Sequence, residues 1–172
     1  TGGERELLTQ LSSSEGSHRW PHVLPGGKAM LYTSQKAPFH NDESKIMVVS
    51  LDGGEPRLVR EGGHDARYVS ASQSLLFAHQ GGLLAGRFDL DSLALETKPI
   101  PVIDHVATSN KAAGHAAVSS DGSLFYVAGG LYGADTPLKF AWVDRAGTHE
   151  ALPLPAAYYR DYFRISPSGD HL

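Results

Sequence analysis

The sequence has 172 residues, of which 41% are hydrophobic and 20% charged, and its formal net charge is −4 at pH 7. This length and apolar content suffice for one packed domain and exclude a disordered chain. The absence of cysteine excludes disulfide scaffolds, cysteine-ligated zinc and thiol catalysis. The acidic balance argues against a nucleic-acid partner, and the apolar runs are too short for direct membrane insertion.

Turn signals recur along the chain with a period of roughly 40–50 residues. They are centred on Gly27, Gln73, Gly122 and Gly169. Each of the first three follows an extended segment and precedes a short run of apolar and aromatic residues, a pattern typical of a β-hairpin. A second turn signal lies near the middle of the period, as at 52–54. Each period therefore predicts two hairpins, and hence four strands.

In chain order, residues 3–11 correspond to the end of such a period and are predicted to be a fourth strand. Three full units follow at 17–59, 60–103 and 104–154, and residues 158–166 are predicted to start another unit. Repeated four-stranded antiparallel units are typical of a β-propeller. We predict an all-β fold, a partial β-propeller of about three blades with a stray strand at each end. A β-sandwich is the alternative, but it would not repeat the same residues at the same phase.

The predicted blade count does not close a ring, because closed propellers have about four to eight blades. Two explanations stay open. In the first, the sequence is part of a longer propeller. In the second, two copies form one ring as a homodimer, and the stray strands at the two ends pair across the chains and remove exposed sheet edges.

The repeats resemble the TolB-like, WD-type propeller repeat of bacteria. The resemblance rests on the Ser-Pro-Ser-Gly-Asp hairpin at 166–170, on its variants at 24–28 and 119–122, and on the run 46–54 with Leu58-Val59 after it. In this group such propellers are docking platforms for proteins or peptides at the cell envelope. The resemblance therefore implies a binding module.

A closer resemblance extends along nearly the whole chain, to the propeller that follows the kinase domain in many bacterial transmembrane serine/threonine kinases. It is carried by segments that include 20–25, 66–68, 99–102 and 142–147. It implies a sensing or interaction module and suggests a periplasmic or other extracytoplasmic location, which the residues themselves do not fix. None of the kinase motifs themselves occurs in the sequence.

The sequence holds no Gly-x-Ser-x-Gly nucleophile elbow, and its nine histidines show no metal-ligand spacing. We predict a non-enzymatic module with no metal site and no cofactor, whose partner is a protein or peptide ligand. One alternative is a fragment of a propeller enzyme, either a metal-dependent lyase with histidines from several blades or the gating domain of a serine hydrolase. A second alternative is a structural unit with no ligand of its own.

Polar side chains recur at an equivalent phase, in and just before the first strand of each unit. In a propeller these strands line the central channel, so we expect the side chains to form its mouth. Arginine and histidine beside aspartate suit the binding of carboxylates or peptide termini, whereas channel residues can also simply bond one another and trapped water. The predicted site residues are His18, Arg19, His22, His64, Asp65, Arg67, His115, Arg160, Asp161 and Arg164.

Overall fold

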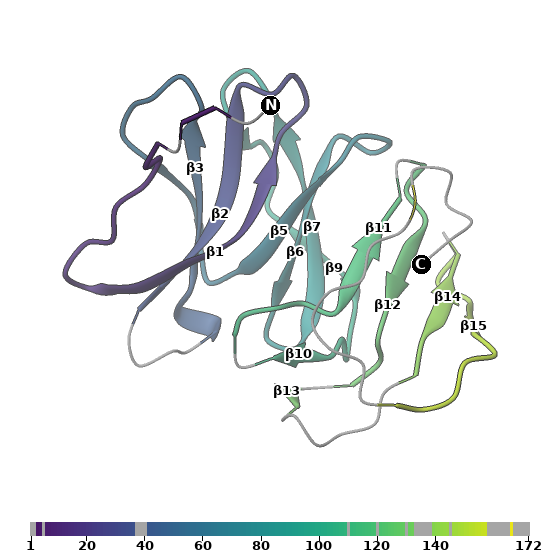
Figure 1. Cartoon of the computed structure of the whole chain (residues 1–172). Helices are drawn as coiled ribbons and strands as arrows, with labels where there is room; N and C mark the ends of the chain where they lie inside the picture. Colours follow the sequence, from purple (N-terminus) through teal and green to yellow (C-terminus); the bar gives the residue numbers. More distant parts are fainter. Residues whose placement is uncertain are drawn as a thin grey trace.

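The computed structural model describes residues 3–4, 6–36, 41–109, 111–119, 121–129, 131–132, 139–144, 146–157 and 166. These residues form three antiparallel sheets of four or five strands and one two-stranded pair. Within them the only helical element is a single 3-10 turn, η1 (Asn41–Glu43). The three sheets lie side by side in chain order (Figure 1). This arrangement confirms the predicted all-β class.

In each large sheet, strands that are neighbours in the sheet are also consecutive members of that sheet along the chain, and the first strand lies at one edge. In the second sheet β9 also pairs with β7. The first sheet comprises β1 (Glu15–Val23), β2 (Ala29–Lys36), β3 (Lys45–Ser50) and β4 (Arg57–Glu61). The second comprises β5 (His64–Val69), β6 (Ser74–His79), β7 (Gly82–Asp89), β8 (Ala94–Leu95) and β9 (Ile100–Ile103). The third comprises β11 (Ala116–Val118), β12 (Leu124–Tyr126), β14 (Ala141–Val143) and β15 (His149–Ala151). The two-stranded parallel pair is β10 (Thr108–Ser109) with β13 (Leu131–Tyr132).

The turns between first and second strands use residues that adopt positive φ angles. Gly26 and Gly27 have φ of 87° and 65° between β1 and β2, and Gly122 has φ of 91° between β11 and β12. Glycine enters this region without the steric cost of a Cβ atom. The turn residues found in the sequence therefore mark the hairpins of the structure.

The middle sheet contributes to two apolar cores, one on each face, because successive residues of a strand point to opposite faces. On β6, Leu75 and Phe77 pack against the first sheet, next to Leu31 and Ile46. The alternate residues Leu76 and Ala78 belong to the core shared with the third sheet. This core consists of Val69, Leu76, Ala78, Leu83, Val106, Ala116, Leu124, Tyr126 and Val143. The three sheets are thus joined by two apolar interfaces.

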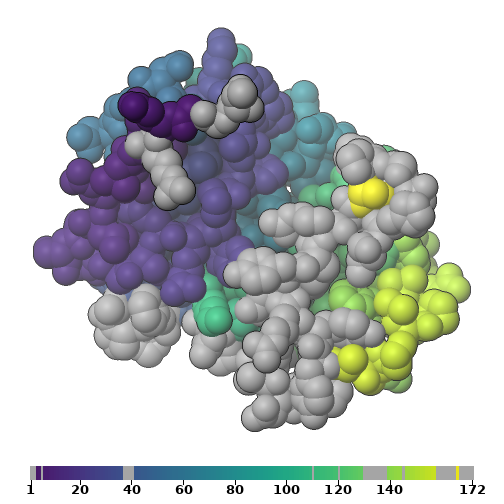
Figure 2. Space-filling view, in the orientation of Figure 1, coloured from purple at the N-terminus to yellow at the C-terminus, as the bar shows by residue number. Residues whose placement is uncertain are grey.

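The structure does not contain the fourth strand predicted at 3–11, because the described residues of this segment, 3–4 and 6–11, belong to no strand. A strand needs a neighbour for its backbone groups, and this segment pairs with none in the described part of the chain. It is attached instead by a side-chain bond between Thr9 Oγ1 and His18 Nδ1 at 2.9 Å, and Leu7 stays 76% exposed. The segment lies over the outside of the first sheet (Figure 2).

The predicted first strand at 158–166 lies outside the described residues except for Ser166, which is in no strand. The pairing of terminal strands across two chains therefore stays a prediction. No helix that is long and apolar enough to cross a membrane occurs among the described residues.

Candidate functional site

A cavity of about 500 Å³ lies where the first strands of the three sheets meet. It is lined by residues 19–22 of β1, residues 65–68 of β5, and Val118 of β11. Its volume lies in the range of about 300–1,000 Å³ found for small-molecule and cofactor pockets. The first strand of every sheet thus contributes to one shared space.

A β-bulge explains why four consecutive residues of one strand line the cavity. On β1, Arg19 pairs with Thr33 and His22 with Leu31, so two residues oppose Tyr32 alone. On β5, His64 pairs with Ala78 and Arg67 with Leu76, so the register shifts in the same way. A bulge interrupts the alternation of side chains and re-aims them. Both inner strands therefore turn extra residues toward the cavity.

The bulges place two non-glycine residues at positive φ, 54° at Trp20 and 50° at Asp65. Such a conformation costs about 1–3 kcal/mol per residue and is most unusual for a bulky side chain. Hydrogen bonds to other parts of the chain hold both residues in place. Trp20 Nε1–H donates to the Lys111 carbonyl at 3.0 Å, and Asp65 N–H donates to Thr33 Oγ1 at 2.9 Å.

Asp65 is the buried anchor of the cavity wall, with 8% of its surface exposed. Its Oδ2 accepts a bond from the Gly114 N–H at 3.0 Å, and both its oxygens lie near Arg67 Nη2, at 3.2 and 3.3 Å. A Cβ on Gly114 would lie 2.8 Å from the Cβ of Ala78, so only glycine fits at this approach. Asp65 therefore holds the chain before β11 against β5 and orients Arg67.

His22 joins the first and second sheets inside the cavity. The Tyr68 backbone N–H donates to His22 Nε2 at 3.1 Å. Because Nε2 accepts, it carries no hydrogen in this arrangement, and the ring is neutral with its hydrogen on Nδ1. Of the described residues that line the cavity, the charged ones are Arg19, Arg67 and Asp65.

The structure brings four of the predicted site residues to the cavity: Arg19, His22, Asp65 and Arg67. His18, His64 and His115 lie elsewhere, and Arg160, Asp161 and Arg164 lie outside the described residues. His64 and His115 are 1% and 2% exposed, because they lie in the packed region where the second sheet meets the chain before β11.

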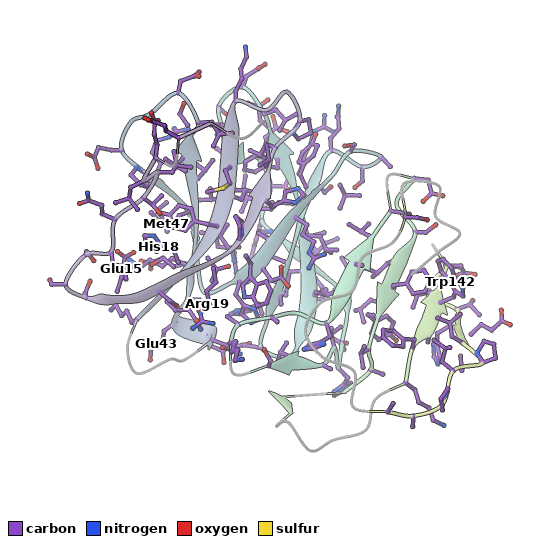
Figure 3. The ribbon with its side chains drawn as sticks, in the orientation of Figure 1. Glu15, His18, Arg19, Glu43, Met47 and Trp142 are labelled. Carbon is purple, nitrogen blue, oxygen red and sulfur yellow. The ribbon has the colours of Figure 1, made fainter. Side chains whose placement is uncertain are left out.

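His18 follows the alternation of β1 and points away from Arg19, toward a small polar cluster beside Glu15 (Figure 3). Its ring packs at 4.6 Å from the ring of Tyr32, and its Nε2 lies 3.3 Å from Glu15 Oε1. Burial opposes ionisation of Glu15, but hydrogen bonds from Ser34 and Ser12, together with His18, outweigh it and lower the pKa of Glu15 to about 2. This carboxylate thus fixes the start of β1. It lies outside the cavity between β1, β5 and β11 and lines a separate, smaller cavity of about 180 Å³.

His64 is buried and neutral, and this makes the stability of the chain depend on pH. Burial lowers the pKa of His64 to about 4, against the opposing effect of its Nδ1–H bond to the Ala112 carbonyl at 2.9 Å. Between pH 6.5 and 4 the unfolded chain then binds a proton that the folded chain does not. Stability is full above pH 6.5 and falls as the pH is lowered toward 4.

We expect the His64 contribution to remove roughly 2–3 kcal/mol of unfolding free energy across this window. The variant His64→Asn keeps an N–H donor near the Ala112 carbonyl and has no group that titrates there. Urea unfolding at pH 7, 5.5 and 4 should therefore give a flatter profile for the variant than for the parent chain. Glu15 does not mask the result, because its stabilisation is lost only between pH 4.5 and 2. Parallel profiles would contradict a buried neutral His64.

The described residues do not form a metal site. Within them, no group of three or more histidine, aspartate and glutamate side chains is placed to hold a metal ion. The described lining of the cavity instead includes two guanidinium groups, one carboxylate and one imidazole. This set suits binding of an anion or a polar ligand by charge-assisted hydrogen bonds.

Sequence reasoning missed the apolar half of the site, which is Trp20, Pro21, Ala66, Tyr68 and Val118. Strict alternation along β1 and β5 would place half of these side chains away from the channel. The bulges that bring them in have no glycine to mark them. The one signal in the sequence that could have identified them is that Trp20 and Tyr68 directly follow the predicted site residues Arg19 and Arg67.

No protein-family model and no curated protein matches the sequence. Among solved structures, the chain is similar to TolB from Acinetobacter baumannii, with a TM-score of 0.61 and 21% identity over 96% of this chain and 38% of that one. It is also similar to puromycin hydrolase, with a TM-score of 0.61 and 13% identity over 89% of this chain and 24% of that one. For oligogalacturonate lyase in complex with manganese, the TM-score is 0.59 and the identity 15%, over 96% of this chain and 48% of that one.

All three of these structures are β-propellers, and at such identities the likeness shows the fold alone. The chain spans less than half the length of each of them. With three antiparallel sheets side by side and their first strands around one cavity, the chain has the fold of a partial β-propeller like that of TolB.

Proposed function

We propose that this chain is a non-enzymatic binding module whose ligand is a protein or peptide held at the cavity between β1, β5 and β11. The observation that carries the proposal is the composition of this cavity. The guanidinium groups of Arg19 and Arg67 and the imidazole of His22 line the same space as the aromatic side chains of Trp20 and Tyr68. A few polar groups in an otherwise apolar concave site are what ligand pockets have in common. The resemblance to kinase-associated propellers supports a sensing or docking role for such a module.

A second candidate is a fragment of a propeller enzyme. It is favoured by the names of two similar structures, puromycin hydrolase and oligogalacturonate lyase. The two candidates differ in the fate of the ligand. A binding module releases a peptide intact, whereas an enzyme fragment that retains activity converts it.

Trp20 provides a direct optical test of the proposal. The chain has two tryptophans, and Trp142 lies on β14 in the third sheet, away from Arg19 and the cavity (Figure 3). In the variant Trp142→Phe, Trp20 is the remaining indole. We expect members of a random heptapeptide library, half with free and half with amidated C-termini, to shift its emission in a saturable way.

The control pair for this test changes valine to phenylalanine at two places. Val118→Phe fills part of the cavity, whereas Val102, which is 46% exposed, lies outside it. Val118→Phe should weaken peptide binding by about 10-fold or more, and Val102→Phe should leave it unchanged. Mass spectrometry of the bound peptides should recover them uncleaved. If no library member shifts the emission of Trp20, the proposed function is wrong.

A further inference from the structure

We infer that the ligand of the cavity carries a carboxylate next to an aromatic or large apolar group, as in a peptide whose C-terminal residue is phenylalanine or leucine. This inference rests on the proposed function and specifies its ligand. Three observations carry it: the charge of the cavity wall, the geometry of Arg67 and the fixed orientation of Trp20.

The charge of the cavity wall favours an anion. Two guanidinium groups, Arg19 and Arg67, face the space with one carboxylate, Asp65. Asp65 is 8% exposed and already accepts bonds from the Gly114 N–H and from Arg67. Among the described lining residues the guanidinium groups therefore outnumber the carboxylate. Guanidinium groups bind carboxylates by charge-assisted hydrogen bonds, so this lining suits an anion.

The geometry of Arg67 leaves part of its guanidinium plane for a second carboxylate. Both oxygens of Asp65 approach the same nitrogen, Nη2, at 3.2 and 3.3 Å. A fork pairing would instead use two nitrogens of the guanidinium in parallel. Within the described part of the chain, Arg67 makes no other hydrogen bond or ion pair. Its side chain is 16% exposed, so it is reachable from the cavity yet weakly hydrated.

Trp20 supplies a preorganised apolar surface beside this charge. Its backbone is held in the bulge of β1, and its Nε1–H donates to the Lys111 carbonyl at 3.0 Å. The indole therefore needs little further ordering when a ligand stacks on it, which favours affinity. Pro21, Tyr68 and Val118 extend the apolar lining. A carboxylate alone would make no use of these apolar side chains, whereas an aromatic or branched apolar side chain would contact them.

The test compares one peptide in two forms, using the intact 172-residue chain. A fluorescein-labelled hexapeptide, Gly-Ser-Gly-Ala-Ala-Phe, is titrated as the free acid and as the C-terminal amide, with fluorescence anisotropy as the readout. We expect the amide to bind at least about 10-fold more weakly, because it loses the charge-assisted bonds to Arg67. This comparison needs no variant and so does not depend on any variant folding.

Two substitutions then assign the preference to a residue. Arg67→Gln should bind the acid and the amide equally. Arg87→Gln is the matched control, because Arg87 Nε also contacts a carboxylate, Glu96 at 2.8 Å, but lies outside the cavity, and this variant should keep the full preference. Competition by N-acetyl-phenylalanine distinguishes the source of the carboxylate. If N-acetyl-phenylalanine competes as strongly as the unlabelled hexapeptide acid, the ligand is a small aromatic acid. If it competes much more weakly, the ligand is a peptide C-terminus.

The outcomes separate the inference from the function on which it rests. Equal binding of acid and amide by the parent chain, or an acid preference that survives in Arg67→Gln, overturns the carboxylate inference. If library peptides still shift the emission of Trp20 in that case, the binding module stands with a different ligand. If neither hexapeptide binds and no library member shifts that emission, the proposed function fails together with the inference.

Discussion

Replacing Asp65 by alanine is expected to lower the unfolding free energy by about 3–5 kcal/mol, because removing one partner of a buried charge pair leaves the other uncompensated. Asp65 accepts bonds from Arg67 and from the Gly114 N–H, and it is 8% exposed. Its loss therefore leaves a poorly hydrated guanidinium and a buried backbone donor without their acceptor. Urea unfolding followed by circular dichroism measures the change.

The matched variant Asp65→Asn separates these two losses. The amide oxygen still accepts from Gly114, whereas the charged partner of Arg67 is gone, so we expect a smaller cost of about 1–2 kcal/mol. Hydrogen exchange at the Gly114 amide should be faster in Asp65→Ala than in Asp65→Asn. A cost below about 1 kcal/mol for the alanine variant would show that Asp65 is not the anchor described above.

Replacing Phe77 by alanine is expected to cost about 3–5 kcal/mol through the lost burial and the cavity left behind. The ring of Phe77 has no exposed surface and lies in the core between the first and second sheets, with Leu31, Ile46 and Leu75. The guanidinium of Arg60 lies 5.0 Å from the centroid of this ring and loses a cation–π contact in the variant. Thermal and urea unfolding both report the loss.

Ile100→Ala provides the control for Phe77→Ala. Ile100 lies on β9 in the same sheet but is 66% exposed, so its truncation should change the stability by less than about 0.5 kcal/mol. A similar loss for both variants would mean that the interface between the first two sheets is not the main apolar core.

The hairpins and the faces of the strands could be predicted from the sequence because both depend on local features. Gly26 and Gly27 favour a tight turn by their own conformational freedom, and the alternation of β6 follows from strand geometry. The segment 3–11 shows the limit of this reasoning. Its pattern resembles a strand, but a strand forms only where a partner offers backbone groups.

The candidate site was predictable in its polar part and not in its shape. Arg19, His22, Asp65 and Arg67 occur at an equivalent phase of two repeats, which is visible in the sequence. The bulge residues Trp20 and Asp65 form side-chain hydrogen bonds with the backbone of Lys111 and Gly114, which lie far away along the chain. The burial of His64 likewise depends on Ala112, so no local pattern distinguishes it from a channel residue.

The segment before β11 also affects how the three sheets unfold. Repeat proteins usually gain stability from neighbouring units alone, which allows units to unfold one at a time. Here the first sheet reaches past the second, because Trp20 bonds the Lys111 carbonyl and the Asn41 side chain donates to the Ser109 carbonyl at 2.7 Å. His64 and Asp65 of the second sheet hold the same segment. Separating the third sheet therefore breaks contacts of both other sheets at once, which makes the arc one cooperative folding unit rather than a row of independent ones.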